Sequence, residues 1–355
     1  MCSSDLRAGA AHLGAWPGAA IGAACGLSFG VQQAVNVDFH EVAFSAPLLA
    51  LAGEAYLRRR WNAVIGWSLP LLLVNEELGV TVAAIGVVLV LMGARRRGAA
   101  LVLAGGAAVA ITVLVLIPAA NPAGHYDYLG HLGAGGDPFG MLHTAWRTKL
   151  ETLTATFAVA GFVALRSPWA LVAVPTLAWR FVGDNSSYWG TGWHYSLGLM
   201  PIVFVALIDT LARLRRGRHP AWLEAPARAM PVLVLAGALI AGKHGPFATV
   251  LRPSAWQVTP QARDAAAAMA SIPPGVSVES DLGLLTHLVQ RDRVYWSGNT
   301  AGVVPQVVVR QDAGPDAAAR VMAGAIAEHP GTRWRVLYDA VGYVVIGLDG
   351  PGGVG

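Results

Sequence analysis

Two short clusters of ionisable residues interrupt the apolar stretches of this 355-residue chain, at positions 38–41 (Asp-Phe-His-Glu) and 75–77 (Asn-Glu-Glu). Carboxylates and an imidazole this close together can bind a divalent cation, or a pyrophosphate through one, and can act as general base or acid. The candidate catalytic residues are Asp38, Glu41, Glu76 and Glu77. The candidate ligands for Mg²⁺ or Mn²⁺ are Asp38, His40 and Glu76.

The adjacent carboxylates Glu76 and Glu77 are the stronger of these two signals. Two neighbouring carboxylates raise each other's pKa, so that one can stay protonated while the other is ionised near neutral pH. Ionisable groups at a membrane boundary are costly unless they face water or a partner, which favours a functional role. The structural alternatives are a water-exposed hairpin tip at 75–77, and a loop at 38–41 in which Asp38 or Glu41 caps the next helix.

Aromatic residues mixed with His and Asp form two further clusters, at 125–128 and 188–195. Rings stack on sugar faces and carboxylates accept hydrogen bonds from hydroxyl groups, so this composition suits carbohydrate binding. An interfacial belt of Tyr and Trp is the alternative interpretation. A helix beginning at His194 could also hold a lipid phosphate at its positive end. The candidate substrate-binding residues are His40, His125, Tyr126, Asp127, Trp189, His194 and Tyr195.

Arginine clusters alternate along the chain with these acidic and aromatic clusters, and apolar runs separate them. The arginines lie at 58–60, 95–97, 166 and 213–218. Because basic loops stay on the cytoplasmic side of a membrane, the acidic clusters are expected to converge on the opposite face. The composition agrees, since 55% of residues are hydrophobic and only 13% are charged, against about a quarter charged in soluble domains.

These elements predict an α-helical polytopic membrane protein, in the cytoplasmic (inner) membrane if bacterial. A spanning helix needs roughly 20 apolar residues, and Pro118 and Pro122 end one of the segments. We expect about nine transmembrane or re-entrant helices, at 12–34, 42–57, two short ones within 61–93, 99–118, 149–165, 168–182, 195–212 and 229–249.

From about residue 253 the pattern changes to alternating short strands and helices. Strands are expected near 276–278, 294–296, 307–309, 333–337 and 343–348, with helices between them. This alternation predicts a small α/β domain over 253–350, on the extracytoplasmic side. No glycine fingerprint follows the first strand, so a dinucleotide site is not expected.

The remaining composition excludes several classes of protein. The formal charge of +4 comes largely from the arginine clusters that set topology, so no nucleic-acid partner is expected. Cys2 and Cys25 are the only cysteines, which argues against a disulfide framework or a cysteine metal site. Residues 1–10 do not have the features of a signal peptide. We expect them to be an unrelated leader joined to a membrane domain over 11–250, which an in-frame stop codon just upstream would disprove.

The chain resembles a family of uncharacterised polytopic membrane proteins that is common in actinobacteria and grouped with the GT-C glycosyltransferases. The resemblance covers nearly all residues after 10. It rests on residues 39–41, the Leu-Leu-Val-Asn-Glu-Glu-Leu-Gly stretch at 72–79, the loop 121–128, His194-Tyr195 and the tail at 281–287 and 291–293.

The resemblance implies transfer of a sugar from a polyprenyl-phosphate donor to a glycan, lipid or protein acceptor at the outer membrane face. Such enzymes carry a key acid in the first outer loop, and that part would precede this chain. Asn75 stands where relatives often have Lys, which removes a contact to the donor phosphate. The alternatives are a transporter and a non-catalytic membrane scaffold for cell-envelope assembly.

Overall fold

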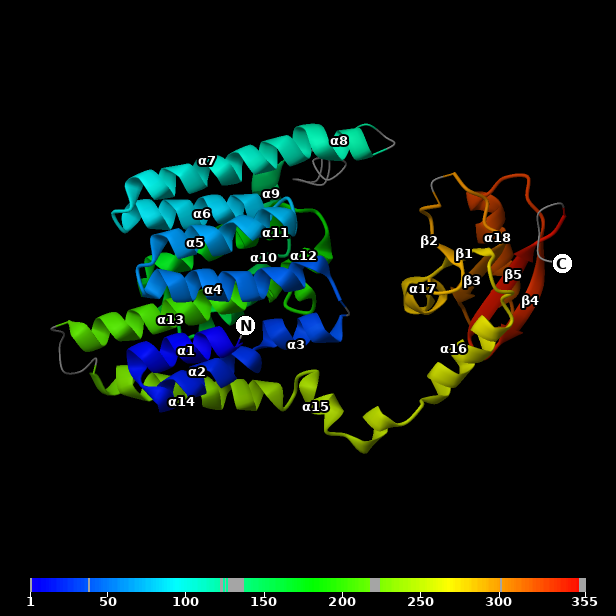
Figure 1. Ribbon diagram of the computed structural model, residues 1–355. Helices are drawn as coiled ribbons and strands as arrows, with labels where there is room; N and C mark the ends of the chain where they lie inside the picture. Colours follow the sequence, from blue (N-terminus) through cyan, green and yellow to red (C-terminus); the bar gives the residue numbers. More distant parts are fainter. Residues whose placement is uncertain are drawn as a thin grey trace. The chain divides into compact units, whose positions relative to one another are not determined.

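The computed structural model describes residues 2–37, 39–121, 124, 126, 137–217, 224–300 and 302–350. The chain divides into two compact units, Met1–Leu251 and Arg252–Gly355. The first unit is built of helices and the second contains a sheet (Figure 1). Each unit has a hydrophobic core of its own.

The first unit consists of apolar helices, most of which lie roughly parallel or antiparallel to one another (Figure 1). Short 3₁₀ turns connect several of them, and a π-helical segment, Thr112–Leu116, links α7 to α8. The α-helices are α1 Cys2–Leu13, α2 Ala15–Gly26, α3 Phe29–Asn36, α4 Ser45–Leu57, α5 Trp61–Ser68, α6 Leu78–Leu91, α7 Arg95–Ile111, α8 Ile117–Ala120, α9 Pro138–His143, α10 Trp146–Ala158, α11 Val174–Val182, α12 Ser186–Trp189, α13 Leu199–Arg216, α14 Glu224–Gly242 and α15 Phe247–Val250.

The expected count of nine spans is not supported. Among the described residues, three helical stretches are long and apolar enough to cross a membrane: Ala15–Asn36, Arg95–Ala120 and Ala225–Gly242. A fourth is possible if the bent pair Ser186–Ser196 and Leu199–Arg216 is one span. The other apolar helices are too short to cross a bilayer alone, since α4 and α10 have 13 residues each and α6 has 14.

Helix α13 forms the centre of the first unit. Every residue from Leu199 to Ala212 is buried, as expected of a helix that is apolar on all sides. Its far end carries a polar network, in which Asp209 accepts hydrogen bonds from Ser167 at 2.6 Å, from Tyr56 at 3.1 Å and from Arg213 at 2.9 Å. This network joins α4, α13 and the turn before α11, and it gives Asp209 a structural role.

Helices α6 and α7 form the most closely packed hairpin of the unit, and they lie side by side at its upper edge in Figure 1. A Cβ atom added at Gly86 would lie 2.7 Å from the carbonyl oxygen of Gly98, and one at Gly105 would lie 2.4 Å from that of Gly79. Small residues at these crossings let the two backbones touch, as in other membrane helix pairs.

The second unit is a mixed sheet with the strand order β2-β1-β3-β5-β4. Strands β1, β2 and β3 are parallel, and β5 pairs antiparallel with both β3 and β4. Helices and strands alternate along the chain as the sequence predicts. They are α16 Pro260–Ala270, β1 Ser277–Ser280, α17 Leu282–Leu288, β2 Arg293–Trp296, β3 Val307–Gln311, α18 Ala317–Glu328, β4 Trp334–Ala340 and β5 Tyr343–Leu348.

Candidate functional site

A cavity of about 790 Å³ lies in the first unit and collects most of the candidate residues that the structure describes. Its walls come from the segment before α4, the turn before α6, the end of α8, helix α11 and the segment before α13. The lining includes His40, Glu41, Asn75, Glu76, Glu77, Ile117, Ala120, Asn121, Tyr126, Trp179, Tyr188, His194 and Tyr195.

Hydrogen bonds connect the carboxylates of this cavity across distant parts of the chain. The side-chain amide of Asn75 donates to Glu41 over 3.2 Å, and the Tyr126 hydroxyl donates to Glu76 over 2.8 Å. The Asn75 side chain also accepts from the backbone amide of Glu77 at 3.2 Å, which fixes the turn that carries the pair. The two acidic clusters of the sequence therefore form one site.

The surroundings of Glu77 change the pKa of its carboxyl group. It lies at the turn between two apolar helices, outside both of them. Burial, together with the charges of Glu76 and Glu41, raises the pKa of Glu77 from 4.5 to about 8. At neutral pH this carboxyl group therefore carries a proton, beside a second carboxylate that is hydrogen-bonded to a tyrosine.

Two histidines stack against each other at the side of the cavity. The ring centroids of His40 and His194 are 3.7 Å apart, with an angle of 23° between the planes. The Nδ1 atom of His194 is buried and has no hydrogen-bond partner among the described residues. His194 and Tyr195 lie in a 3₁₀ turn, His194–Ser196, and α13 begins only at Leu199. The expected α-helix start at His194 is therefore wrong.

An aromatic wall faces the carboxylates. Trp179, Tyr188 and Tyr195 pack edge to face, with centroid separations of 5.0 Å for Trp179–Tyr188, 5.0 Å for Tyr188–Tyr195 and 5.9 Å for Trp179–Tyr195. Edge-to-face packing is a preferred geometry of aromatic pairs. The wall is thus rigid, and all three rings line the cavity.

Arg180 holds this wall in place and was not among the candidate site residues. Its guanidinium is fully buried and donates to the carbonyls of Tyr188 and Gly190, both at 2.7 Å, and to the Ser196 hydroxyl at 3.1 Å. Its sequence signal is a single arginine inside an apolar segment. A buried guanidinium with three acceptors is a positioning group.

Among the described candidate residues, Trp189 lies outside the cavity. Trp189 does not line the cavity, because its indole donates to the Gly183 carbonyl at 2.8 Å and the Lys149 ammonium lies 4.6 Å from the centre of its ring. Lys149 is itself buried and donates to the Met141 carbonyl. Asp38, His125 and Asp127 lie outside the described residues.

The described residues of this cavity do not form a group of three metal ligands. Among the described residues, the one group of three possible ligands is Glu279, Glu328 and His329, in the second unit. His40 and Glu76 do not form such a group with a third described residue. The third expected ligand, Asp38, lies outside the described part of the chain.

Long apolar helices and an acid-lined cavity among the described residues of the first unit are typical of a helical membrane protein with a polar site in its bundle. The chain belongs to a family of predicted membrane proteins, DUF2079, whose family model matches residues 18–345. The match covers both units. No curated protein and no solved structure matches the chain.

Proposed function

We propose that this protein is a GT-C-related glycosyltransferase that moves a sugar from a polyprenyl-phosphate donor to a glycan, lipid or protein acceptor at the outer membrane face. The observation that carries the proposal is the single cavity in which Glu41, Glu76 and Glu77 meet an aromatic wall. Within this group, one carboxyl holds a proton at neutral pH and another is hydrogen-bonded to a tyrosine.

The carboxylates have complementary roles in this reaction. Glu76 takes the proton of the acceptor hydroxyl as the oxygen attacks the anomeric carbon of the sugar. The bond between that carbon and the phosphate oxygen breaks, and the lipid phosphate leaves. Glu77, which is protonated, donates a hydrogen bond to the departing phosphate. The aromatic wall stacks against the sugar. Glu41 and His40 accept hydrogen bonds from the hydroxyl groups of the sugar.

The charge of the cavity requires a counter-ion for a phosphate-bearing donor. Its described lining contains Glu41, Glu76 and the protonated Glu77, and neither lysine nor arginine. A Mg²⁺ or Mn²⁺ ion held by Glu76 and His40, with Asp38 as the third expected ligand, would supply that charge. When bound, the ion would offset the negative charge of the lipid phosphate.

The surface beside the cavity suits a lipid donor. Ile117 and Ala120 line the cavity. Just before them, Leu114, Val115 and Leu116 expose 70%, 56% and 56% of their surface. In a bilayer this apolar surface contacts lipid chains, so a polyprenyl tail can lie along α7 and α8 with its phosphate in the cavity.

Mass spectrometry of lipids that copurify with the protein tests the proposal. We expect a polyprenyl phosphate or its glycoside with the unaltered protein, and much less of it with the Glu76→Gln, Glu77→Gln variant. Glu151→Gln, which alters an exposed carboxylate on α10 outside the cavity, is the matched control. Only bulk phospholipid in all three samples would contradict the proposal.

A transporter is the second candidate, because two of the helices around the cavity are irregular. The segments Ser186–Ser196 and Leu199–Arg216 meet at a bend of 66°, and a π-helical segment precedes the cavity residues of α8. Broken helices of this kind line transport sites. Solute flux in proteoliposomes that depends on Glu77, without any sugar transfer, would favour this function. If substitution of Glu76 and Glu77 changes neither sugar transfer nor solute flux, the protein is a non-catalytic scaffold.

A further inference from the structure

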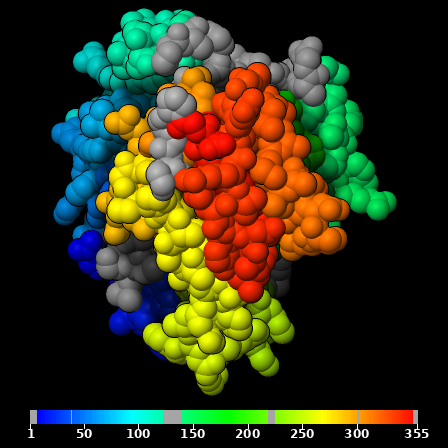
Figure 2. Space-filling model, turned by 90° about the vertical axis from the view of Figure 1, so that its right-hand side faces the viewer, coloured from blue at the N-terminus to red at the C-terminus, as the bar shows by residue number. Residues whose placement is uncertain are grey.

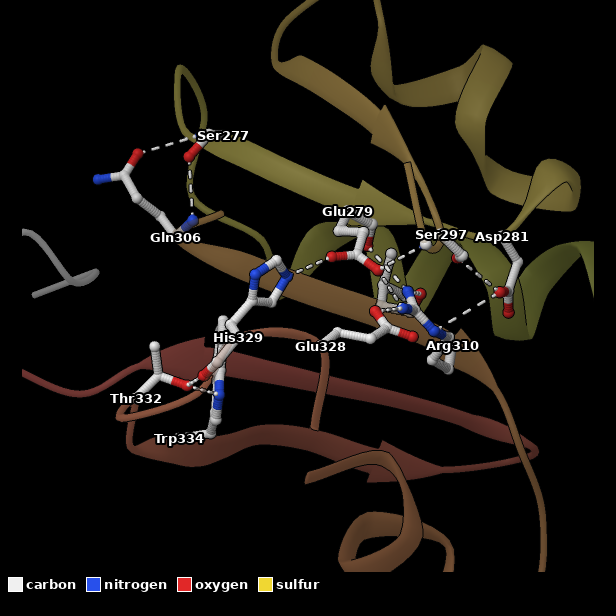
Figure 3. A network of polar contacts seen from close by, with 12 residues as sticks. Ser277, Glu279, Asp281, Ser297, Gln306, Arg310, Glu328, His329, Thr332 and Trp334 are labelled. Carbon is white, nitrogen blue, oxygen red and sulfur yellow. Dashed lines mark hydrogen bonds and ion pairs between the residues drawn. The ribbon is translucent and has the colours of Figure 1, made fainter. Parts of the chain in front are cut away.

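The second unit contains a buried carboxylate that stability alone does not explain. Glu279 lies on β1 with none of its surface exposed. It forms an ion pair with Arg310 of β3, contacts His329 Nε2 at 2.8 Å and accepts a hydrogen bond from the Gly298 amide at 3.4 Å (Figure 3). An apolar core of similar volume is commonly as stable as a buried ion pair, or more stable. The arrangement joins three elements around one charged group.

His329 is the member of this network that borders open space. It follows α18 and exposes 7% of its surface. In the neutral tautomer that donates from Nε2 to the buried Glu279 carboxylate, Nδ1 is a hydrogen-bond acceptor. No described residue is hydrogen-bonded to Nδ1. A histidine held this way on one side, with its other nitrogen unused, is prepared to accept a hydrogen bond from a ligand.

A pocket of about 350 Å³ lies beside this histidine. Its walls are Gly298, Asn299, Thr300, Gly302, Val304, Glu328, His329 and Pro330. Part of the wall comes from the loop between β2 and β3. There Gly298 and Gly302 adopt φ angles of +74° and +79°, which favour glycine. The same Gly298 amide is bound by Glu279, so the carboxylate positions both the loop and the imidazole.

The charges around the pocket argue against a metal ion and against an anion. Arg310 Nη2 contacts both carboxylates, Glu279 and, at 3.4 Å, Glu328 (Figure 3). The guanidinium therefore already occupies the position between the two carboxylates that a cation would take. The described pocket lining contains neither lysine nor arginine, and Glu328 would repel an anion.

What remains are donors and acceptors for a neutral molecule. Asn299 and Thr300 can donate and accept, while Glu328 and His329 Nδ1 can accept. Burial and the neighbouring carboxylate raise the pKa of Glu328, so this group can also donate when it is protonated. Closely spaced groups of both kinds match the alternating hydroxyl groups of a sugar ring.

We propose that this pocket binds one neutral, polyhydroxylated sugar ring, held by His329, Glu328, Asn299 and Thr300. The site is separate from the cavity of the first unit, and it does not depend on the transfer reaction proposed there. The ring can be a free monosaccharide or the terminal unit of a longer glycan.

Saturation-transfer NMR on the full chain in nanodiscs tests this site. The probes are glucose, galactose, mannose, N-acetylglucosamine and arabinose, each as the free sugar and as its methyl glycoside. We expect at least one sugar to bind, and to bind about tenfold more weakly to His329→Gln and to Asn299→Ala, because each variant loses one hydrogen bond. Binding of the methyl glycoside indicates a glycan terminus, whereas binding of the free sugar alone indicates a monosaccharide.

Two controls keep the result interpretable. His287→Gln changes an exposed histidine on α17 and is expected to leave sugar binding unchanged. Asn299 is exposed and outside the buried ion-pair network, so its variant is expected to fold even if His329→Gln does not. The proposal is overturned if no sugar binds, if Asn299→Ala binds sugar normally, or if Zn²⁺ or inorganic phosphate binds this pocket instead.

Discussion

The pair Glu76-Glu77 shows how one turn gives two identical side chains different chemistry. Glu76 accepts a hydrogen bond from Tyr126. Burial, together with the charges of Glu76 and Glu41, raises the pKa of Glu77 to about 8. Adjacent carboxylates predicted such a split, but Tyr126 and Glu41 reach the pair only through the fold.

Glu77→Gln is expected to lower activity by about 10²- to 10⁴-fold, the usual contribution of a positioned acid or base. In the unaltered protein, activity that needs protonated Glu77 falls as pH rises through about 8. Because the pKa of Glu77 is raised from 4.5 on folding, its protonation contributes to the free energy of unfolding. This contribution is complete below pH 4.5 and is lost as pH rises through about 8. A pH–rate profile is the measurement, and a high-pH limb that persists in Glu77→Gln would contradict the assignment.

Arg180→Met is expected to destabilise the first unit strongly. The change leaves two backbone carbonyls and the Ser196 hydroxyl without their donor, and each unpaired buried group costs about 1–3 kcal/mol. Arg147→Met, which alters an exposed arginine on α10, is the control. Thermal unfolding followed by tryptophan fluorescence measures both, and similar midpoints for the two variants would show that Arg180 does not hold the wall.

At the scale of elements, the site depends on short helices meeting end to end. Helix α4 begins just after the segment that carries Glu41, and α6 begins just after Glu77. Both helices begin directly after a polar turn, and these turns line the cavity. The glycine-lined hairpin of α6 and α7 then holds the turn beside the end of α8.

Gly86→Val is expected to separate α6 from α7. Its side chain would meet the backbone of Gly98 and Val102, at 2.7 Å in each case, and such overpacking costs about 1–3 kcal/mol. Gly106→Val is the matched control, because a Cβ atom on that residue of α7 meets nothing within 4 Å. Thermal unfolding in detergent compares the two, and an equal loss of stability would mean that helix propensity, and not contact, decides the effect.

At the scale of the whole molecule, a membrane unit and a sheet-containing unit follow one another through an exposed segment. All residues from 251 to 260 are exposed, among them Leu251 at 86% and Trp256 at 77%. This stretch is coloured yellow-green in Figure 2 and lies on the surface at the bottom of that view. The alternation of arginine and acidic clusters leads us to propose that it lies on the extracytoplasmic side.

Cysteine labelling in intact cells tests this orientation. In a background with Cys2→Ser and Cys25→Ala, a membrane-impermeant maleimide is expected to label Ser254→Cys, because the segment is exposed and outside. Arg96→Cys, which is also exposed but lies in an arginine cluster, is expected to react only after the cells are opened. The reverse pattern would place the second unit in the cytoplasm.

The sequence by itself determined the local features of this protein. Apolar runs, their interruptions and the change to strand–helix alternation near residue 253 follow from neighbouring residues alone. In the structure, the first compact unit ends at Leu251. The length of apolar runs overestimated the number of spans, because it does not show where a helix breaks inside such a run.

Only the tertiary structure decided which residues meet. The contacts of Asn75 with Glu41 and of His40 with His194 join segments far apart in the chain. The same holds for Glu279 and His329, which lie 50 positions apart. Such contacts depend on how helices and strands pack, and packing is a property of the whole chain that no local pattern of residues contains.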